Sequence, residues 1–435
     1  MGTTMLELAK QHEQKLIDYR RDFHRHAEAA WTEFRTASIV AERLEKLGYE
    51  VSAGDAVMNA GAMMGVPSAA ELVSHQERAI QQGGNAAWID KMKGGKTGVV
   101  GVMKFSQPGP TVAFRFDMDA NDVNEAQSEN HRPWQKGFAS VNKEAMHACG
   151  HDGHSSVGLV LAEILAGCKQ NLAGTVKFIF QPAEEGVRGA KAMMAAGVVD
   201  DVDYLLGMHL GIGLKKAGAV TLETVGFLAT TKLDAVFTGV PAHAGAAPET
   251  GRNALLAAAA AALNLHAISR HSQGASRINV GVLEAGTGRN VIPANAVLKL
   301  ETRGTTSEIN EFVFGEAMRI LKAAADMYGV SLSTAEMGGA AGCGNSPELV
   351  KRLIGIAERS NLFKEILPSA SIGGSEDCTY FMERVQQRGG QSAYLMVGAD
   401  LAAGHHDSRF DFSEESLVSA AALLGEIAAD LLKKE

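Results

Sequence analysis

Several features that define whole classes of protein are absent from this sequence of 435 residues. No window of about 18 consecutive apolar residues occurs, so no transmembrane helix is expected. No block of Lys and Arg stands out, and the formal net charge is −9. An acidic chain without a basic patch is a poor match for nucleic acid or for an anionic membrane surface. We therefore expect neither as a partner.

Cysteine is also scarce, with four scattered residues and no spacing typical of a disulfide framework. The first 28 residues have the spacing of an amphipathic helix and lack the apolar core of a signal peptide. We therefore expect a cytoplasmic protein whose thiols stay reduced. Cys168, Cys343 and Cys378 are expected to be buried small side chains.

The length predicts two or three domains. Residues 1–50 have a helical pattern, and residues 52–97 have the composition of an insertion, rich in Ala, Gly, Met and Gln and partly helical around 71–80. Short, nearly continuous apolar strands then alternate with helices, which is typical of an α/β architecture with a buried sheet. The strands are expected at 98–105, 111–116, 175–180 and 204–209, and a helix at 155–166.

The pattern changes near residue 226, where apolar and polar residues begin to alternate. Two helices over about four antiparallel strands are expected for a small α+β domain. We predict that residues 226–340 form a domain inserted into an α/β host made of 1–225 and 341–435. Its strands are expected at 228–238, 276–283 and 296–303, and its helices at 253–265 and 307–328.

The densest cluster of chemically active side chains is MHACGHDGH, residues 146–154. Gly150 allows a tight turn between Cys149 and His151. A thiolate and an imidazole two residues apart can share a divalent metal such as zinc or manganese. Asp152 is then expected to orient a histidine ligand. The alternative is a polar loop that caps the following helix.

A second candidate segment is QPAEEG, residues 181–186, which follows an apolar strand. Two adjacent carboxylates at a strand end are costly unless something neutralises or uses them. Because Glu184 and Glu185 point in different directions, one can bind a metal while the other transfers a proton. Alone, such a pair is more often an ordinary acidic loop.

Two further histidine sites complete the candidate ligand set. His209 ends an apolar run, and His405 and His406 lie in AAGHHDSRFDF. Either site alone would more often be structural, but together with the first two segments they supply enough ligands for two metals. Ends of strands are where an α/β sheet places its site. The pattern predicts metal-assisted hydrolysis. A zinc deaminase would need Cys-x-x-Cys, which does not occur.

Five segments in order together resemble the M20 metallopeptidase family, in its branch of amidohydrolases that act on auxin conjugates, hippurate and other N-acyl amino acids. The resemblance covers nearly the whole chain. It implies a zinc-exopeptidase-like α/β catalytic domain with an inserted α+β, ferredoxin-like domain that serves as lid and dimerisation domain. The segments are MHACGHDGH, QPAEEG, GVPAHAGAAPETGRNAL (239–255), GTGRNVIPANA (286–296) and GSEDCTYF (374–381).

The resemblance also implies two divalent metal ions, Mn or Zn, and a bridging role for Cys149. Glu184 corresponds to the general base that activates water. His406 is preferred as the last ligand because its spacing to Phe410 fits the His-x-x-x-Phe pattern of the branch, and His405 is the alternative. The implied ligands are Cys149, His151, Glu185, His209 and His406.

In the inserted domain, His243 corresponds to a histidine that reaches across a dimer interface and stabilises the oxyanion. Asn290 corresponds to a substrate-binding position. Arg303 either pairs with a substrate carboxylate or forms a surface ion pair, and Arg289 is a similar case. The segment AEMGGAAGCGN lacks an arginine that some family members carry there.

Three segments, RRDFHRHAEAAWTEFRTA, HRPWQKGFAS and GHHDSRFDF, narrow the resemblance within the branch. They imply a small amide substrate with a carboxylate, namely p-aminobenzoyl-glutamate, cleaved to p-aminobenzoate and glutamate. Other N-acyl amino acids or short peptides are the alternative. A homodimer or a hetero-oligomer with a second, related chain is expected. Asp117 and Asp119, in FRFDMDAND, either support the ligands or are turn residues.

Overall fold

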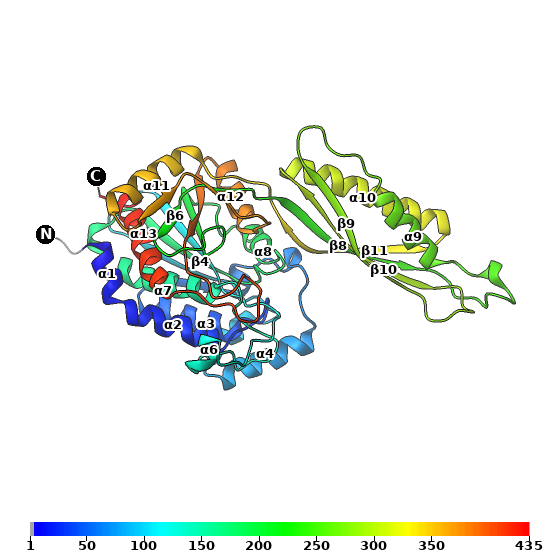
Figure 1. The fold of residues 1–435 in the computed structure, drawn as a ribbon, viewed down its shortest axis with the longest axis horizontal. Helices are drawn as coiled ribbons and strands as arrows, with labels where there is room; N and C mark the ends of the chain where they lie inside the picture. The colour runs from blue at the N-terminus through cyan, green and yellow to red at the C-terminus, as the bar shows by residue number, and fades with distance from the viewer. Residues whose placement is uncertain (1–3, 435) are drawn as a thin grey trace. The chain divides into compact units, whose positions relative to one another are not determined.

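The structure is a computed structural model that describes residues 4–434. The chain forms two compact units (Figure 1). Unit 1 comprises Met1–Gly226, Gly344–Gly373 and Asp377–Glu435, and unit 2 comprises Phe227–Cys343 and Gly374–Glu376. Within residues 4–434, no helix has both the length and the apolar character needed to cross a bilayer.

Unit 1 contains eleven of the α-helices that the structure describes and ten of its strands, and these can be followed by colour in Figure 1. Its helices are α1 (Met5–Gln11), α2 (Glu13–Arg25), α3 (Phe34–Lys46), α4 (Ala69–Gln81), α5 (Ala86–Ile89), α6 (Arg132–Gln135), α7 (His151–Gly167), α8 (Ala190–Ala195), α11 (Pro347–Ser360), α12 (Cys378–Gln387) and α13 (Glu415–Leu431). Its strands are β1 (Glu50–Ala53), β2 (Val99–Lys104), β3 (Thr111–Asp117), β4 (Thr175–Gln181), β5 (Tyr204–Leu210), β6 (Ala219–Thr221), β7 (Thr224–Val225), β12 (Glu365–Leu367), β13 (Ala370–Ser371) and β14 (Gln391–Val397).

The main sheet of unit 1 has eight strands in the order β1-β2-β4-β3-β5-β14-β6-β12. Its four central strands, β4, β3, β5 and β14, run parallel to one another. Each of them buries every residue after its first. Strands buried on both faces must be covered by helices on both faces. This confirms the predicted α/β architecture, and it brings the carboxyl ends of four strands to one edge.

Helices α7, α11 and α12 pack directly on the central strands, α7 on β3 and α12 on β5 and β14. Helix α7 is almost entirely buried because α2 and α13 cover it in turn. The predicted N-terminal helix is in fact two helices, α1 and α2, which meet at His12. The His12 imidazole Nδ1 donates to the Leu8 carbonyl oxygen at 2.8 Å, so it takes up a carbonyl group at the end of α1.

The insertion between β1 and β2 forms a helical layer on α3. Its main helix, α4, confirms the helical stretch expected around 71–80, and it begins at a capping box between Ser68 and Glu71. Short helical turns complete the layer, namely α5 and the 3₁₀ turns η1 (Gly54–Ala56), η2 (Ala60–Ala62) and η3 (Asp90–Met92). Apolar periodicity could not predict these pieces because each is only three or four residues long.

Unit 2 is a four-stranded antiparallel sheet in the order β11-β8-β10-β9 with two helices. Alternate residues of β8 and β10, such as Phe237 and Leu298, pack against α9 and α10. The chain order β-α-β-β-α-β with this strand order is ferredoxin-like, as predicted. Its elements are β8 (Ala229–Thr238), α9 (Ala254–Leu265), β9 (Ser276–Ala285), β10 (Asn295–Gly304), α10 (Ser307–Tyr328) and β11 (Ser331–Ala340).

Candidate metal centre and active site

The candidate site lies at the carboxyl edge of the four parallel strands in unit 1. Strand β3 ends at Asp117, beside Gln181 at the end of β4. His209 is the penultimate residue of β5, beside Met396 of β14. Because each strand is followed by a segment that carries candidate ligands, the sheet gathers residues that are far apart in the sequence.

The tight turn predicted at Gly150 is present, with a φ of +96°. The predicted start of the following helix, at Ser155, is wrong by four residues. Helix α7 begins at His151, with Gly150 as its N-cap. Cys149 therefore lies directly before the N-terminus of a 17-residue helix. The partial positive charge of a helix N-terminus favours a thiolate over a thiol.

His151 and His209 are buried imidazoles of the Cys149 cluster, and each uses Nδ1 for a backbone hydrogen bond. His151 Nδ1 donates to the Asp119 carbonyl oxygen at 2.8 Å, and its buried Nε2 has no hydrogen-bond partner among the described residues. His209 Nδ1 donates to the Leu210 carbonyl oxygen at 2.9 Å, and its Nε2 lies 3.5 Å from Cys149 Sγ. A carbonyl partner on Nδ1 leaves Nε2 with the lone pair that binds a metal.

Electrostatics favour a metal in this cluster. Burial, together with the electrostatic effect of the nearby His154, lowers the pKa of His209 well below its usual range, so the ring is neutral. Burial and the charge of Glu185 raise the pKa of the Cys149 thiol. A divalent cation reverses that shift, because a coordinating thiol is deprotonated. The donor set is therefore suited to a metal and costly without one.

The loop that carries the two glutamates is held by buried carboxylates through its backbone. Asp119 accepts hydrogen bonds from the amides of Glu184 and Glu185, at 3.0 and 2.8 Å. Glu33 accepts one from the amide of Ala183 at 2.8 Å. Ala183 has a φ of +51°, which is unusual for a residue with a side chain. The anchors maintain this strained turn.

Glu185 and His406 form a second group around Cys149. His406 Nε2 lies 3.3 Å from the buried Glu185 Oε1. Hydrogen bonds to Cys149 and Glu185 raise the pKa of His406 to about 10. His405 instead packs on Phe410, with 4.9 Å between ring centroids. Of the two neighbours, the structure therefore groups His406 with the candidate ligands.

Cys149 belongs to two ligand groups at once. In each group the ligand atoms all lie within 4.8 Å of one another. If each group held a divalent metal, Cys149 would be a ligand of both. Each group also contains a buried atom of a kind that binds metals, His151 Nε2 in the first and Glu185 Oε1 in the second. The groups are Cys149, His151 and His209, and Cys149, Glu185 and His406.

Glu184 lies beside this cluster and is only partly exposed. Its Oε2 is 3.9 Å from His151 Nε2, and its side chain is 12% exposed. It shares a further potential ligand group with His151 and Glu185. A carboxylate next to the ligand atoms and open to solvent can exchange a proton with a bound water, which is what a general base must do.

Asp152 does not have the predicted contact with a histidine ligand. Its carboxylate accepts from Arg20 Nε at 3.1 Å and from His24 Nδ1 at 2.9 Å. Asp152 follows His151 in the first turn of α7, so its side chain leaves the helix in a different direction. The Asp119 carbonyl orients His151 instead. Asp152 ties α2 to the helix that carries the ligand.

His24 is the centre of this buried network, because its Nε2 also lies 2.9 Å from Glu125 Oε1. Burial lowers the pKa of His24, but its hydrogen bonds to Asp152 and Glu125 outweigh burial and raise it to about 9. The ring is therefore an imidazolium at neutral pH and donates from both nitrogens. Two carboxylates compensate a buried cation, as burial requires.

This shift predicts a dependence of stability on pH. A pKa raised on folding from 6.5 to about 9 contributes stability that is complete below pH 6.5 and is lost as the pH rises through 9. One such group changes the free energy of unfolding by up to about 1.4 kcal/mol per pH unit. We expect His24→Gln to remove this contribution. The free energy of unfolding, measured with urea, should then decline less between pH 6.5 and 9 than it does in the wild type. His26→Gln, at the end of the same helix, should retain the contribution; equal declines in all three proteins would contradict the assignment.

Sequence reasoning missed several residues that position the site, among them Arg20, His24, Glu33 and Asp377. They lie far along the chain from the segments that they support. Asp377 Oδ2, for example, accepts from the amides of Gly189 and Ala190. Their local segments, such as DYRRDFHRHAE around Arg20 and His24, do not identify a partner. Asp119, by contrast, was predicted either to support the ligands or to be a turn residue. It accepts hydrogen bonds from His151 and from the amides of Glu184 and Glu185, as a supporting residue would.

Cys149 is the one cysteine that belongs to a potential ligand group among the residues that the structure describes. All four are free. Cys343 and Cys378 are buried, as predicted, whereas Cys168 is only half-buried because it lies at the end of α7.

In unit 2, His243 and Asn290 lie on adjacent loops. The amide of Ala244 donates to the Asn290 carbonyl oxygen at 2.9 Å. The exposed His243 ring accepts from the amides of Gly245 and Ala246 at Nδ1, both at 3.1 Å. The proton must then be on Nε2, so this ring is oriented as a hydrogen-bond donor.

The two arginines of interest in unit 2 differ. Arg303 forms a two-point ion pair with Glu301, at 2.9 and 3.1 Å. A substrate carboxylate would have to compete with this internal partner. Arg289 is exposed and follows β9 in the loop that carries Asn290.

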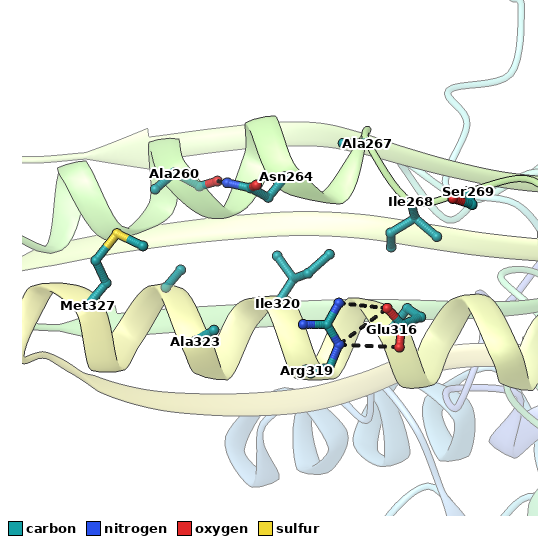
Figure 2. A pocket seen from close by; sticks show the side chains of 11 residues that line it. Ala260, Asn264, Ala267, Ile268, Ser269, Glu316, Arg319, Ile320, Ala323 and Met327 are labelled. Atoms are coloured by element: carbon teal, nitrogen blue, oxygen red, sulfur yellow. Dashed lines mark hydrogen bonds and ion pairs between the residues drawn. The ribbon is translucent and has the colours of Figure 1, made fainter.

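A groove of about 370 Å³ lies between α9 and α10 of unit 2 (Figure 2). Its walls are mostly small or apolar, and its polar side chains include Glu316 and Arg319, which pair at 2.7 Å. An exposed ion pair of this kind contributes little energy. The groove is lined by none of the predicted site residues and by none of the potential ligand groups found among residues 4–434.

The α/β sheet with candidate metal ligands at its carboxyl edge, together with the ferredoxin-like insert, is the arrangement of a class of metallohydrolases. The sequence profile of Peptidase family M20/M25/M40 matches residues 113–430. The chain belongs to this family.

Three known proteins are similar over nearly the whole chain. The A component of the p-aminobenzoyl-glutamate hydrolase of Escherichia coli (strain K12) is 52% identical over 95% of both chains. The indole-3-acetyl-aspartic acid hydrolase of Enterobacter agglomerans is 50% identical over 93% of both. The crystal structure of an aminobenzoyl-glutamate utilization protein from Klebsiella pneumoniae has a TM-score of 0.84 and 44% identity, over 98% of this chain and 97% of that one.

Proposed function

We propose that this chain hydrolyses the amide bond of p-aminobenzoyl-glutamate and releases p-aminobenzoate and glutamate. The observation that carries the proposal is Cys149, shared by two ligand groups with Glu184 beside them. The similarity to one component of a p-aminobenzoyl-glutamate hydrolase supports the choice of substrate. The cofactor would be two divalent metal ions, Mn or Zn, because thiolate, imidazole and carboxylate donors suit both.

The bound metals would polarise the scissile carbonyl and lower the pKa of water. Glu184 accepts a proton from the attacking water, and the resulting hydroxide adds to the amide carbon. Glu184 returns the proton to the leaving nitrogen as the C–N bond breaks, which gives a carboxylic acid and an amine. His151 and His209 keep their orientation through the Asp119 and Leu210 carbonyl oxygens.

His243 is proposed to donate a hydrogen bond from Nε2 to the oxyanion, from the lid of a second copy of the chain. His243 Nδ1 accepts hydrogen bonds from two backbone amides, so Nε2 is left as the donor. This arrangement supports the role. Asn290, on the adjacent loop, is proposed to contact the substrate. Arg303 remains a candidate for its carboxylate, in competition with Glu301.

The direct test is hydrolysis by the purified protein supplied with Mn²⁺ or Zn²⁺. We expect release of p-aminobenzoate from p-aminobenzoyl-glutamate, and loss of that release when a chelator removes the metal. Absence of turnover with either metal would overturn the proposal. The control is the same protein with Mg²⁺, which the thiolate and imidazole donors disfavour.

A second candidate substrate is another N-acyl amino acid, such as indole-3-acetyl-aspartate, or a short peptide. The 50% identity to an enzyme named for that conjugate favours it over an unrelated amide. A panel of aroyl, indole-acetyl and dipeptide substrates under identical conditions separates the two by their kcat/KM values.

The Escherichia coli relative is named as one component of a hydrolase, which suggests that this chain assembles either as a homodimer or with a second, related chain. The edge strand β9 and helix α9 offer an apolar surface for such an interface, with Leu263 77% and Leu283 43% exposed.

A non-enzymatic role within a hetero-oligomer is disfavoured by the complete ligand set. Measurement of the molecular mass in solution, for the protein alone and mixed with a candidate second, related chain, distinguishes the assemblies. The four cysteines form no disulfide among residues 4–434, which is compatible with the cytoplasmic location that we propose.

A further inference from the structure

We infer that Arg188 binds a carboxylate on the amino-acid half of the substrate and so determines specificity; this inference rests on the proposed function. Arg188 lies in the same loop as Glu184 and Glu185, three residues beyond the candidate ligand. Its Nε donates to the Glu185 carbonyl oxygen at 3.0 Å. The guanidinium is thus held on the backbone of the residue whose side chain belongs to the candidate metal centre.

The position of this guanidinium is determined at three points. Nη1 donates to the carbonyl oxygen of Gly65, in the insertion, at 3.3 Å. The guanidinium also lies against Gly186, where an added Cβ would be 2.9 Å from Arg188 Nε. Gly186 has a φ of +85°, so both its conformation and its lack of a side chain are needed there. The side chain is therefore pre-organised.

The loop beneath Arg188 is itself rigid. The backbone amides of Arg188 and Gly189 both donate to the Ala183 carbonyl oxygen, at 3.1 and 2.9 Å. The buried carboxylates of Glu33 and Asp377 hold the two ends of the loop. A recognition group is more selective when the backbone that carries it cannot yield to a poor ligand.

What Arg188 lacks is an anion. Among residues 4–434, no Asp or Glu carboxylate lies within ion-pair distance of its half-buried guanidinium, and its two hydrogen bonds go to neutral carbonyl groups. Other shielded arginines of unit 1 all have carboxylate partners, namely Arg20, Arg35, Arg78 and Arg115. An arginine has five N–H donors, so three remain free here.

A carboxylate is the ligand that matches these free donors. The planar guanidinium presents pairs of N–H groups that fit both oxygens of a carboxylate, and a partly desolvated cation gains most from such a partner. In an N-acyl amino acid, the α-carboxylate is separated from the scissile nitrogen by a single carbon. An anion held against Glu185 therefore places the amide bond close to the candidate metal ligands.

The experiment compares Arg188→Gln with wild type on p-aminobenzoyl-glutamate and on its α-amide and γ-amide. We expect the variant to lose on the order of 10- to 100-fold in kcat/KM on the diacid, mostly through KM. On the amide that lacks the contacted carboxylate, we expect a loss of less than about threefold, because that contact is already missing. The amide that shows this identifies which carboxylate Arg188 binds.

Controls separate recognition from damage to the loop. Arg188→Lys should restore part of the discrimination, since it keeps the charge. Arg352→Gln, on the outer helix α11, should match wild type. Equal losses on all three substrates, or lower metal content in both Arg188 variants, would assign Arg188 a structural role and overturn the inference. Selective loss in Arg303→Gln in place of Arg188→Gln would overturn it as well. If the wild-type protein cleaves none of the substrates, that result overturns the proposed function itself, and with it the inference about Arg188.

Discussion

Glu184→Gln should lower kcat by roughly 10²- to 10⁴-fold while the protein keeps its metals. The amide is nearly isosteric with the carboxylate but cannot accept a proton from water. The backbone amide of Glu184, which Asp119 holds, is unaffected by the substitution. The measurement is kcat on p-aminobenzoyl-glutamate together with metal content by elemental analysis.

The matched control is the neighbouring Glu185→Gln. Glu185 belongs to the ligand group with Cys149 and His406, so its variant should lose metal affinity as well as activity. The two adjacent substitutions should therefore separate chemistry from metal binding. If Glu184→Gln kept more than a tenth of the wild-type kcat, or if it lost its metals as Glu185→Gln does, Glu184 would not be the general base.

The second large effect is expected at His406. We expect His406→Ala to weaken metal binding by at least about 100-fold, since loss of even a supporting residue around a metal costs 10- to 100-fold. His406 lies 3.3 Å from Glu185 and shares a ligand group with Cys149. Metal affinity is measured by competition with a chelating indicator for Zn²⁺.

His405→Ala provides the comparison. His405 packs between His209 and Phe410, with ring centroids at 5.4 and 4.9 Å, whereas the His406 side chain is 57% exposed. Thermal unfolding of the metal-free proteins should therefore be affected more by His405→Ala than by His406→Ala. Metal affinity should show the opposite order. If His405→Ala weakened metal binding more, the assignment of the last ligand would pass to His405.

The sequence predicted those parts of the candidate site that depend on neighbouring residues. The turn at Gly150 and the segments that carry Cys149, His151 and the two glutamates could be found because a ligand pair and its glycine are local features. Strands β3, β4 and β5 were predicted within a residue or two, because strands buried on both faces are continuously apolar. Their parallel alignment then follows from the helices between them.

The remaining features depend on contacts between distant parts of the chain. Glu33 and Ala183 are 150 residues apart, and Arg20 and Asp152 are 132 apart. No local pattern identifies such a pair. The start of α7 was misplaced because a glycine-rich, polar segment resembles a loop, although the Gly150 turn opens the helix directly. The role expected of Asp152 followed from its position beside His151, whereas helix geometry turns its side chain toward α2.

The support that Glu33, His24 and Arg20 give to the site sets a lower limit on the length of a working fragment. The family profile begins at residue 113, and every candidate metal ligand lies within it. A fragment cut at that point would contain all the reactive groups, but it would lack the carboxylate that holds Ala183 and the cations that neutralise Asp152. In grafting or recombination between relatives, the first 35 residues and the loop at 181–189 should therefore be inherited together.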